Sequence, residues 1–469
     1  MIPVTGHVGK TVAVFGLGLS GLAAARALKA GGADVVVWDD AAAGIDKART
    51  EGFTAGDLRQ ADWRAVAALV LAPGVPLTHP EPHWTVKLAQ EAGVPVIGDT
   101  ELFSLEHARS NTRARIAAIT GTNGKSTTSA LTAHILAAAG RKTALGGNIG
   151  TAVLDLPPFA DDMHYVIEYS SFQIDLTPSL RANAAALLNI TPDHLDRHGT
   201  LANYAAVKAR IFDTLGPGDR AVISIDDQLS ASIAYTHPTR AEICRISCET
   251  EVSHGVYARD GRLIEVVRGQ ASRALDISGV GSLRGVHNWQ NAAAALALTR
   301  ALGLSLEEIE AGLKSFPGLA HRMEEVARLG RVLFINDSKA TNADAAAKAL
   351  AALDQIYWIA GGRAKAGGLA GLDPFFPRIR KAYLIGEAEE VFARALAGKL
   401  AIERCGVLET AVVRAARDAA VSGDAAPVVL LSPACASFDQ YPNFMARGEA
   451  FRAAVASLQG VAMRSEAAA

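Results

Sequence analysis

The sequence of 469 residues has little of several features that mark specialised proteins. It contains four cysteines, its aromatic content is 6%, and its acidic and basic residues nearly cancel to a formal net charge of −2. No polybasic stretch predicts binding to nucleic acid or to an anionic membrane surface. No apolar run approaches the roughly 20 residues of a membrane span, and the first ten residues lack the apolar core of a signal peptide. We therefore expect a cytoplasmic protein.

The cysteines predict neither a metal site nor a disulfide framework. Cys244, Cys248, Cys405 and Cys435 form no Cys-x-x-Cys pair, and no cluster of histidine or cysteine beside them completes a zinc site. Reduced thiols are expected, as in other cytosolic proteins. Half of the residues are hydrophobic, which excludes disorder over most of the chain.

Short apolar runs alternate with longer helical patterns along the chain. Runs such as Val12–Phe15 and Ile116–Ile119 are continuous, which is typical of parallel strands buried on both faces. Helical patterns such as Ser126–Ala139 separate these runs, which favours an α/β fold. Polar residues interrupt the pattern near 98–115, and proline and glycine interrupt it near 316–322. These interruptions predict three domains, at 1–97, 98–317 and 318–469.

A glycine-rich turn follows the first predicted strand. The pattern Gly16-x-Gly18-x-x-Gly21 stands between a strand and a helix, and Asp39 ends the next predicted strand. This arrangement is typical of dinucleotide-binding turns, in which the glycines admit phosphate and the acid binds a ribose hydroxyl. A nucleotide or nucleotide-sugar site, a nicotinamide site and a turn without ligand all stay open, although nothing further along the chain supports hydride transfer.

The segment GTNGKST at 121–127 carries a more specific signal. It joins a predicted strand to an alanine-rich helix, and backbone N–H groups at such a junction bind polyphosphate. Lys125 can reach the β- and γ-phosphates, and Ser126 or Thr127 can bind Mg²⁺. Ile119 stands where the standard spacing has its first glycine, so this loop is a shortened variant. Adenine is favoured over guanine because no NKxD-type segment is present.

Two further strand ends carry residues that could hold a metal ion. Glu168 ends a strand in the segment EYSSFQ, and His194 follows another strand in NITPDHLDRHG. Because the carboxyl ends of parallel strands share one sheet edge, both residues should lie beside the phosphate loop. Mg²⁺ prefers oxygen ligands, so a histidine is an unusual partner for it.

Taken in order, GTNGKST, EYSSFQ, DHLDRHG and HNWQN resemble the Mur ligase family, and the resemblance covers essentially the whole chain. Segments 334–342, 359–369 and 430–444 are similar to those of its D-glutamate-adding members. The resemblance implies an α/β fold with an N-terminal Rossmann-like domain, a central P-loop ATPase-like parallel sheet and a C-terminal Rossmann-like domain. It also implies a reaction of cytoplasmic peptidoglycan precursor synthesis. ATP phosphorylates the carboxylate of UDP-N-acetylmuramoyl-L-alanine, and the amine of D-glutamate attacks the acyl phosphate through a tetrahedral intermediate.

The resemblance also implies roles for individual residues. Lys125, His194 and Lys208 would be catalytic. Two Mg²⁺ ions would be held by Ser126, Glu168, His194 and Lys208, with Lys208 carbamylated; from its own sequence context Lys208 is a solvated helix lysine. ATP would contact Gly121, Thr122, Asn123, Gly124, Lys125, Ser126, Thr127, Asn288, Asn291, Arg322 and Asp337. The UDP-linked substrate would contact Gly18, Leu19, Ser20, Asp39, Pro73, Gly74, Asn148, Ser170 and Gln173. D-glutamate would contact Lys339, Thr341, Lys365, Ser437 and Phe444.

Three alternatives remain. Another Mur ligase or a folylpolyglutamate-type ligase would use a different acceptor, but SKATN and SPACASFDQ favour D-glutamate and no DNPR-like segment is present. A nicotinamide oxidoreductase would leave GTNGKST unexplained. A P-loop switch or binding protein would leave the third domain unexplained. We expect small-molecule substrates, no nucleic-acid partner, no membrane span and a monomer.

Overall fold

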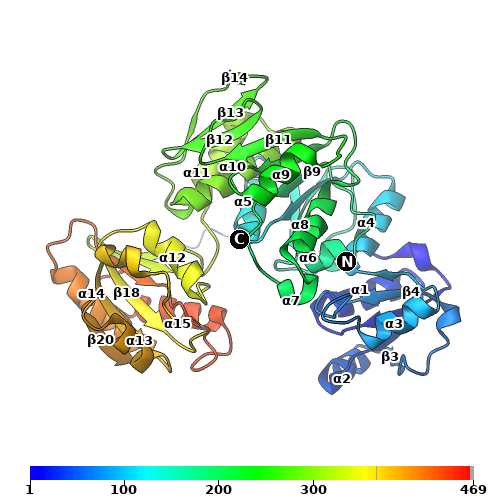
Figure 1. The fold of residues 1–469 in the computed structure, drawn as a ribbon, viewed down its shortest axis with the longest axis horizontal. Coiled ribbons are helices and arrows are strands. Elements are labelled where there is room, and N and C mark those ends of the chain that lie inside the picture. The colour runs from blue at the N-terminus through cyan, green and yellow to red at the C-terminus, as the bar shows by residue number, and fades with distance from the viewer. Residues whose placement is uncertain (366, 465–469) are drawn as a thin grey trace. The chain divides into compact units, whose positions relative to one another are not determined.

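A computed structural model describes residues 1–365 and 367–464. They divide into two units: the first comprises Met1–Ile277 with Trp289–Ser315, and the second comprises Ser278–Asn288 with the chain from Phe316 onward. Both units are drawn in Figure 1. The described residues form three sheets with helices between their strands, which confirms the predicted α/β class. The domain limits stay a prediction, and residues 366 and 465–469 of the predicted third domain lie outside the described residues.

The first sheet is parallel and has the strand order β3-β2-β1-β4-β5. Alternate residues of β1 point to opposite faces: Val12 and Val14 pack in the core that contains helix α1, whereas Ala13 and Phe15 pack in the core that contains α3. This two-sided burial explains why the sequence shows a continuous apolar run. The strands are β1 (Thr11–Phe15), β2 (Asp34–Trp38), β3 (Thr54–Ala55), β4 (Val66–Leu71) and β5 (Val96–Ile97), and the helices are η1 (Thr5–His7), α1 (Leu19–Ala30), α2 (Ala42–Thr50), η2 (Trp63–Ala65) and α3 (Trp84–Glu91).

The second sheet is parallel from β7 to β12, in the order β7-β8-β6-β9-β10-β11-β12. Beyond β12 it continues as antiparallel strands, which the sequence analysis did not predict. The β12–β13 turn contains Asp260 and Gly261, both at positive φ. An Asp-Gly pair between two strands is typical of a β-hairpin turn, so this hairpin could have been predicted from the sequence. The strands are β6 (Arg115–Thr120), β7 (Lys142–Gly147), β8 (Met163–Glu168), β9 (Ala184–Leu187), β10 (Arg220–Ser224), β11 (Glu242–Ser247), β12 (Gly255–Arg259), β13 (Arg262–Val267), β14 (Gln270–Ala271) and β15 (Leu275–Asp276).

Helix α4 (Asp99–Ser110) occupies much of the polar segment that we predicted as a domain boundary. Its first turn is buried although it carries Asp99 and Glu101, so polarity there does not mark an exposed linker. The helices that follow α4 along the chain are α5 (Lys125–Ala138), η3 (Val153–Asp155), α6 (Ser171–Asp175), α7 (Leu195–His198), α8 (Leu201–Ala209), η4 (Arg210–Phe212), α9 (Gln228–Thr236), η5 (Gly281–Leu283), α10 (Val286–Ala301) and α11 (Leu306–Ser315). Among the described residues, no helix is long and apolar enough to cross a membrane.

The sheet of the second unit has the order β20-β19-β18-β21-β17-β16-β22, and it is parallel from β20 to β17. Helices α12 and α13 pack on one face, and α14 and α15 pack on the other (Figure 1). Its strands are β16 (Glu324–Leu329), β17 (Val332–Asn336), β18 (Ile356–Gly361), β19 (Ile379–Ile385), β20 (Ile402–Gly406), β21 (Val428–Leu431) and β22 (Ala462–Met463), and its helices are α12 (Ala343–Ala351), η6 (Asp373–Arg378), α13 (Glu389–Leu396), α14 (Leu408–Val421) and α15 (Phe444–Ala456).

Candidate active site

The phosphate loop and Glu168 lie at one edge of the second sheet. Glu168 pairs in register with Ile119 on one side and with Gly147 on the other, and Thr120 pairs with Leu187. The loop after β6, the end of β8 and the segment after β9 therefore leave the sheet at the same level. This register confirms the prediction that these strand ends share an edge.

The phosphate loop is shaped by two glycines and held by an asparagine. Gly121 and Gly124 have φ values of +154° and +84°, and a Cβ on Gly124 would collide with Oδ1 of Asn291. That oxygen also accepts a hydrogen bond from Oγ1 of Thr128, at 3.2 Å. The buried Asn291, which we predicted to contact ATP, therefore packs helix α10 against the loop and against the first turn of α5.

Lys125 and Asn189 close the loop on itself. The Lys125 ammonium donates to the carbonyl oxygens of Gly121 and Thr122, both at 2.8 Å. The Asn189 side chain accepts from the backbone N–H of Asn123 at 2.8 Å and donates to its carbonyl oxygen at 3.1 Å. Sequence reasoning missed Asn189, although its position two residues after a buried strand was a usable signal.

Lys208 lies beneath the phosphate loop rather than in solvent. Its side chain is only 1% exposed, and its ammonium donates to the carbonyl oxygen of Gly121 at 2.9 Å. The same nitrogen lies 4.7 Å from the ring centroid of Tyr204. Burial, reinforced by the nearby Lys125 cation, places the pKa of Lys208 well below its ordinary value, although Glu168 opposes this shift. The sequence context alone gave no sign of this burial.

Only one of the two carboxylate oxygens of Glu168 is hydrogen-bonded. Oε1 accepts from the Asn148 side-chain amide at 2.6 Å, whereas Oε2 is buried without a hydrogen-bond partner. A buried, unpartnered carboxylate oxygen fits the hard-oxygen ligand that Mg²⁺ requires. The described residues nevertheless contain no group of three or more His, Cys, Asp or Glu arranged to hold a metal. A complete coordination shell here therefore needs ligands of another kind, such as phosphate oxygens, hydroxyls or a modified lysine.

Two histidines of the segment DHLDRHG occupy different environments. The backbone of His194 is left-handed, with φ of +52°. Its half-exposed ring has its centroid 4.9 Å from the ring centroid of Phe172, and its Nε2 lies 3.5 Å from Oδ2 of Asp193. His198, which we did not predict, is buried, and its Nε2 lies 2.9 Å from the Ser171 hydroxyl. Burial lowers the pKa of His198 to about 4, so this ring is neutral near pH 7.

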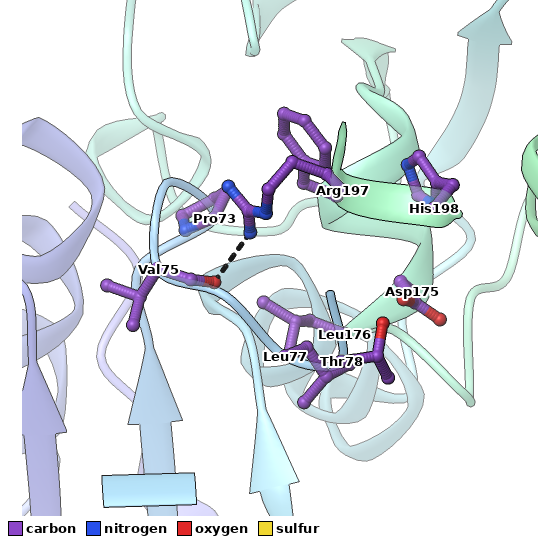
Figure 2. A pocket seen from close by; sticks show the side chains of 9 residues that line it. Pro73, Val75, Leu77, Thr78, Asp175, Leu176, Arg197 and His198 are labelled. Carbon is purple, nitrogen blue, oxygen red and sulfur yellow. Dashed lines mark hydrogen bonds between the residues drawn. The ribbon is translucent and has the colours of Figure 1, made fainter. Parts of the chain in front are cut away.

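Arg197 connects this segment to the loop that contains Pro73 and Gly74 (Figure 2). Its guanidinium donates to the carbonyl oxygens of Gly74 and Val75, both at 2.8 Å, and lies 4.6 Å from the ring centroid of Phe172. The hollow beside these contacts is lined by Pro73, Val75, Leu77, Thr78, Phe172, Asp175, Leu176, Arg197 and His198. Arg197 therefore fixes a loop that we predicted to support the diphosphate.

In the first glycine-rich turn, the acidic residue accepts hydrogen bonds from the backbone of the turn itself. Asp39 accepts from the backbone N–H groups of Leu17 at 2.6 Å and of Ala41 at 2.8 Å, which braces the turn that ends at Gly18, the N-cap of α1. Leu19 is exposed in the first turn of α1, and the Ser20 hydroxyl faces the buried Asp99 carboxyl. Hydrogen bonds within the chain therefore hold the conformation of this turn.

Ser170 and Gln173 partner each other at the start of α6. The Gln173 side chain accepts from the Ser170 N–H at 3.0 Å, and the Ser170 hydroxyl accepts from the Gln173 N–H at 3.2 Å. This reciprocal pair is a capping box. It gives both predicted substrate residues a structural role as well.

Three predicted ATP residues lie in the second unit. Asp337 is buried directly after β17, and its carboxyl accepts from the Ser432 hydroxyl at 2.8 Å. Burial raises the pKa of Asp337 to about 7. The Asn288 side chain donates to the carbonyl oxygen of Arg284 at 2.9 Å. Arg322 stands between two residues of positive φ, in the segment that leads into β16.

The predicted D-glutamate residues follow three neighbouring strands of the second unit. Register pairs Asn336 of β17 with Leu431 of β21, and the Gly361 N–H at the end of β18 donates to Pro433. The loops after these strands therefore lie at one sheet edge. They carry Lys339, Thr341, Lys365 and Ser437, and Phe444 begins the following helix. The Lys339 ammonium lies 4.1 Å from the Phe444 ring centroid, Ser437 is buried, and Lys365 is exposed.

Comparison with known proteins gives matches along nearly the whole chain. Family models match at residues 10–98 (Mur ligase MurD-like, N-terminal domain), 119–299 (Mur ligase middle domain) and 321–435 (Mur ligase, glutamate ligase domain). A UDP-N-acetylmuramoylalanine–D-glutamate ligase of Nitrobacter winogradskyi is 56% identical over 462 residues, covering 98% of this chain and 99% of its own length. The ligase of the same name from Brucella suis is 55% identical over 469 residues, covering 99% and 100%.

Solved structures share the fold at lower identity. UDP-N-acetylmuramate-alanine ligase from Thermotoga maritima matches with a TM-score of 0.55 at 16% identity, over 94% of this chain and 98% of its own. An Acinetobacter baumannii ligase named for the addition of D-alanyl-D-alanine matches with a TM-score of 0.54 at 19% identity, over 76% and 78%. The family models and the full-length relatives above 50% identity establish that the chain belongs to the Mur ligase family.

Proposed function

We propose that this protein is an ATP-dependent ligase that joins D-glutamate to UDP-N-acetylmuramoyl-L-alanine in cytoplasmic peptidoglycan precursor synthesis. The observation that carries the proposal is the 56% identity, over 98% of the chain, to a ligase of that name. The closed phosphate loop with its lysine supports the ATP-dependent step. The three loops at one sheet edge of the second unit offer hydroxyl and ammonium groups that suit an amino acid with two carboxylates.

The reaction needs a leaving group, because a carboxylate is a poor electrophile at neutral pH. A carboxylate oxygen of the UDP-linked substrate attacks the γ-phosphorus of ATP, the bond to the ADP oxygen breaks, and an acyl phosphate forms. Lys125 and the N–H groups of the loop bind the phosphates and stabilise the charge that develops on them. The neutral amine of D-glutamate then attacks the acyl carbon and forms a new C–N bond. The nitrogen of the tetrahedral intermediate loses one proton, the C–O bond to the phosphate breaks, and the amide and inorganic phosphate are left.

Mg²⁺ fits the acidic edge beside this loop, where it would neutralise phosphate charge when bound. We propose two ions, held by Ser126, Glu168, His194 and a carbamylated Lys208. Burial and the nearby Lys125 cation lower the pKa of the Lys208 amine, which favours the neutral form whose nitrogen can attack CO₂. The new N–C bond turns the amine into a carbamate, and one proton leaves. The resulting anion would stand close to Glu168 and would supply the oxygen ligands that the unmodified chain lacks.

We assign the two organic substrates to separate residue sets. The UDP-linked substrate would bind along the first glycine turn and the sheet edge, at Gly18, Leu19, Ser20, Asp39, Pro73, Gly74, Asn148, Ser170 and Gln173. D-glutamate would bind at Lys339, Thr341, Lys365, Ser437 and Phe444. ATP would also contact Asn288, Asn291, Arg322 and Asp337. The active species is proposed to be a monomer.

The decisive experiment measures phosphate release from ATP, with Mg²⁺ and UDP-N-acetylmuramoyl-L-alanine, across a panel of D- and L-amino acids. Release that requires D-glutamate is the expected result. Release with another amino acid would overturn the assignment of the acceptor and keep the ligase chemistry. No release with any acceptor, in a folded protein that still binds ATP, would overturn the ligase proposal. Lys125→Ala should abolish turnover at unchanged melting temperature, whereas Lys142→Ala, an exposed lysine at the start of β7, should leave turnover intact.

A further inference from the structure

Arg447 is a buried arginine in the second unit for which the reaction above gives no role. It lies in helix α15 with only 1% of its surface exposed. Nε donates to the Ser338 hydroxyl at 3.0 Å, and Nη2 donates to the carbonyl oxygens of Ser338 at 2.9 Å and of Cys435 at 3.0 Å. Nη1 is buried without a partner and lies 3.1 Å from the position that a Cβ on Gly362 would take.

These contacts reach all three loops that carry the proposed D-glutamate residues. Ser338 directly precedes Lys339, Cys435 stands two residues before Ser437, and Gly362 stands three residues before Lys365. The Ser338 hydroxyl also donates to the carbonyl oxygen of Phe444 at 2.8 Å. One guanidinium thus hydrogen-bonds the backbones of two of these loops and packs beside the third, at Gly362. The planar fork of arginine can donate to several acceptors in fixed directions, which a lysine ammonium cannot do.

The charge of Arg447 is not neutralised by direct contact with a described carboxylate. Among residues 1–365 and 367–464, no carboxylate forms an ion pair with its guanidinium, and Asp439 acts on it only through a longer-range electrostatic attraction. Burying a cation without a partner is unfavourable, and an apolar side chain of similar size would be cheaper for stability alone. A positive charge kept at this position favours an anionic ligand at the loops above it, and it favours an acidic amino acid over a neutral one.

We propose that Arg447 is a positioning and specificity residue for the acidic amino-acid acceptor. It fixes the loops that bind the acceptor through their backbones and adds positive potential to the pocket, without itself touching the substrate. The inference rests on the proposed function, because the three loops are assigned there to D-glutamate. It concerns only the acceptor, so ATP and the UDP-linked substrate should be bound independently of Arg447.

Arg447→Lys tests this inference because it keeps the positive charge and removes the planar guanidinium group. The KM for D-glutamate should rise about 10-fold or more, as expected when hydrogen bonds to loop backbones are lost. The KM values for ATP and for the UDP-linked substrate should stay within about twofold of the wild type. Arg417→Lys, on the exposed face of α14 in the same unit, is the matched control and should change none of the three constants.

Ser338→Ala provides a second test, should Arg447→Lys fold poorly. It removes the hydroxyl that joins Arg447 to Phe444 and should raise the KM for D-glutamate selectively. The double variant should show less than the sum of the two single effects, since both changes break one network. Equal rises in all three KM values, or no rise for D-glutamate, would overturn the inference. If the wild type itself does not use D-glutamate, the proposed function has failed instead.

Discussion

The buried Asp99 allows a quantitative prediction about stability and pH. Its side chain is 2% exposed at the start of α4, and both carboxylate oxygens are buried. Burial raises the pKa of Asp99 from its ordinary value of 3.8 to about 6, with the Ser20 hydroxyl and the helix backbone partly opposing the change. The folded protein therefore holds a proton on Asp99 that the unfolded chain releases at lower pH.

The sign of the effect follows from proton linkage. Between about pH 4 and pH 6 the unfolded chain is ionised at Asp99 while the folded protein is not, so stability falls as the pH rises through this window. The pKa of Asp99 rises from 3.8 in the unfolded chain to about 6 in the folded protein. At about 1.36 kcal/mol for each pKa unit, this difference lowers the free energy of unfolding at pH 7 by about 3 kcal/mol. Asp99→Asn has nearly the same shape and carries no charge, so it should be more stable than the wild type at pH 7 by up to this amount.

The measurement compares thermal unfolding of the wild type and Asp99→Asn at pH 4.5 and at pH 7. Hydrogen exchange of the α4 amides at matched pH provides a local readout. The advantage of the variant should be largest at pH 7 and should shrink toward pH 4.5. Asp34→Asn, at the exposed start of β2, is the control and should show no such difference. An advantage that is absent at pH 7, or equal at both pH values, would refute the reasoning.

Three further predictions concern the phosphate loop and a buried thiol. Gly124→Ala should lower kcat/KM for ATP by roughly 100-fold or more, because the new Cβ meets Asn291 at a positive φ; Gly140→Ala, where nothing lies near the new Cβ, should retain activity. Asn189→Ala should raise the KM for ATP about 10-fold through the loss of two hydrogen bonds to the loop, and an unchanged KM would contradict the bracing role. Burial raises the pKa of the Cys244 thiol to about 12, so mass spectrometry should detect alkylation of Cys244 at pH 8 only after unfolding.

The sequence predicted well those features that depend on neighbouring residues. The runs at Val12–Phe15 and Ile116–Ile119 are strands β1 and β6 of parallel sheets, and the segment after Ile119 forms a phosphate loop followed by a helix. Glu168 stands at the expected sheet edge because a parallel sheet aligns its strand ends. The antiparallel extension after β12 escaped prediction, since its strands are short and partly exposed.

What the sequence could not determine are the environments of single side chains. Lys208 has the local sequence of a surface helix residue, yet it is buried under the loop that begins at Gly121, 87 positions away. Arg447 lies 109 positions from Ser338 and holds it by two hydrogen bonds. Local spacing determines backbone conformation and the chemistry that a loop can offer. Burial, charge neutralisation and pKa depend on which distant segments pack together, and the tertiary structure alone decided these for Lys208, Arg447 and Asp99.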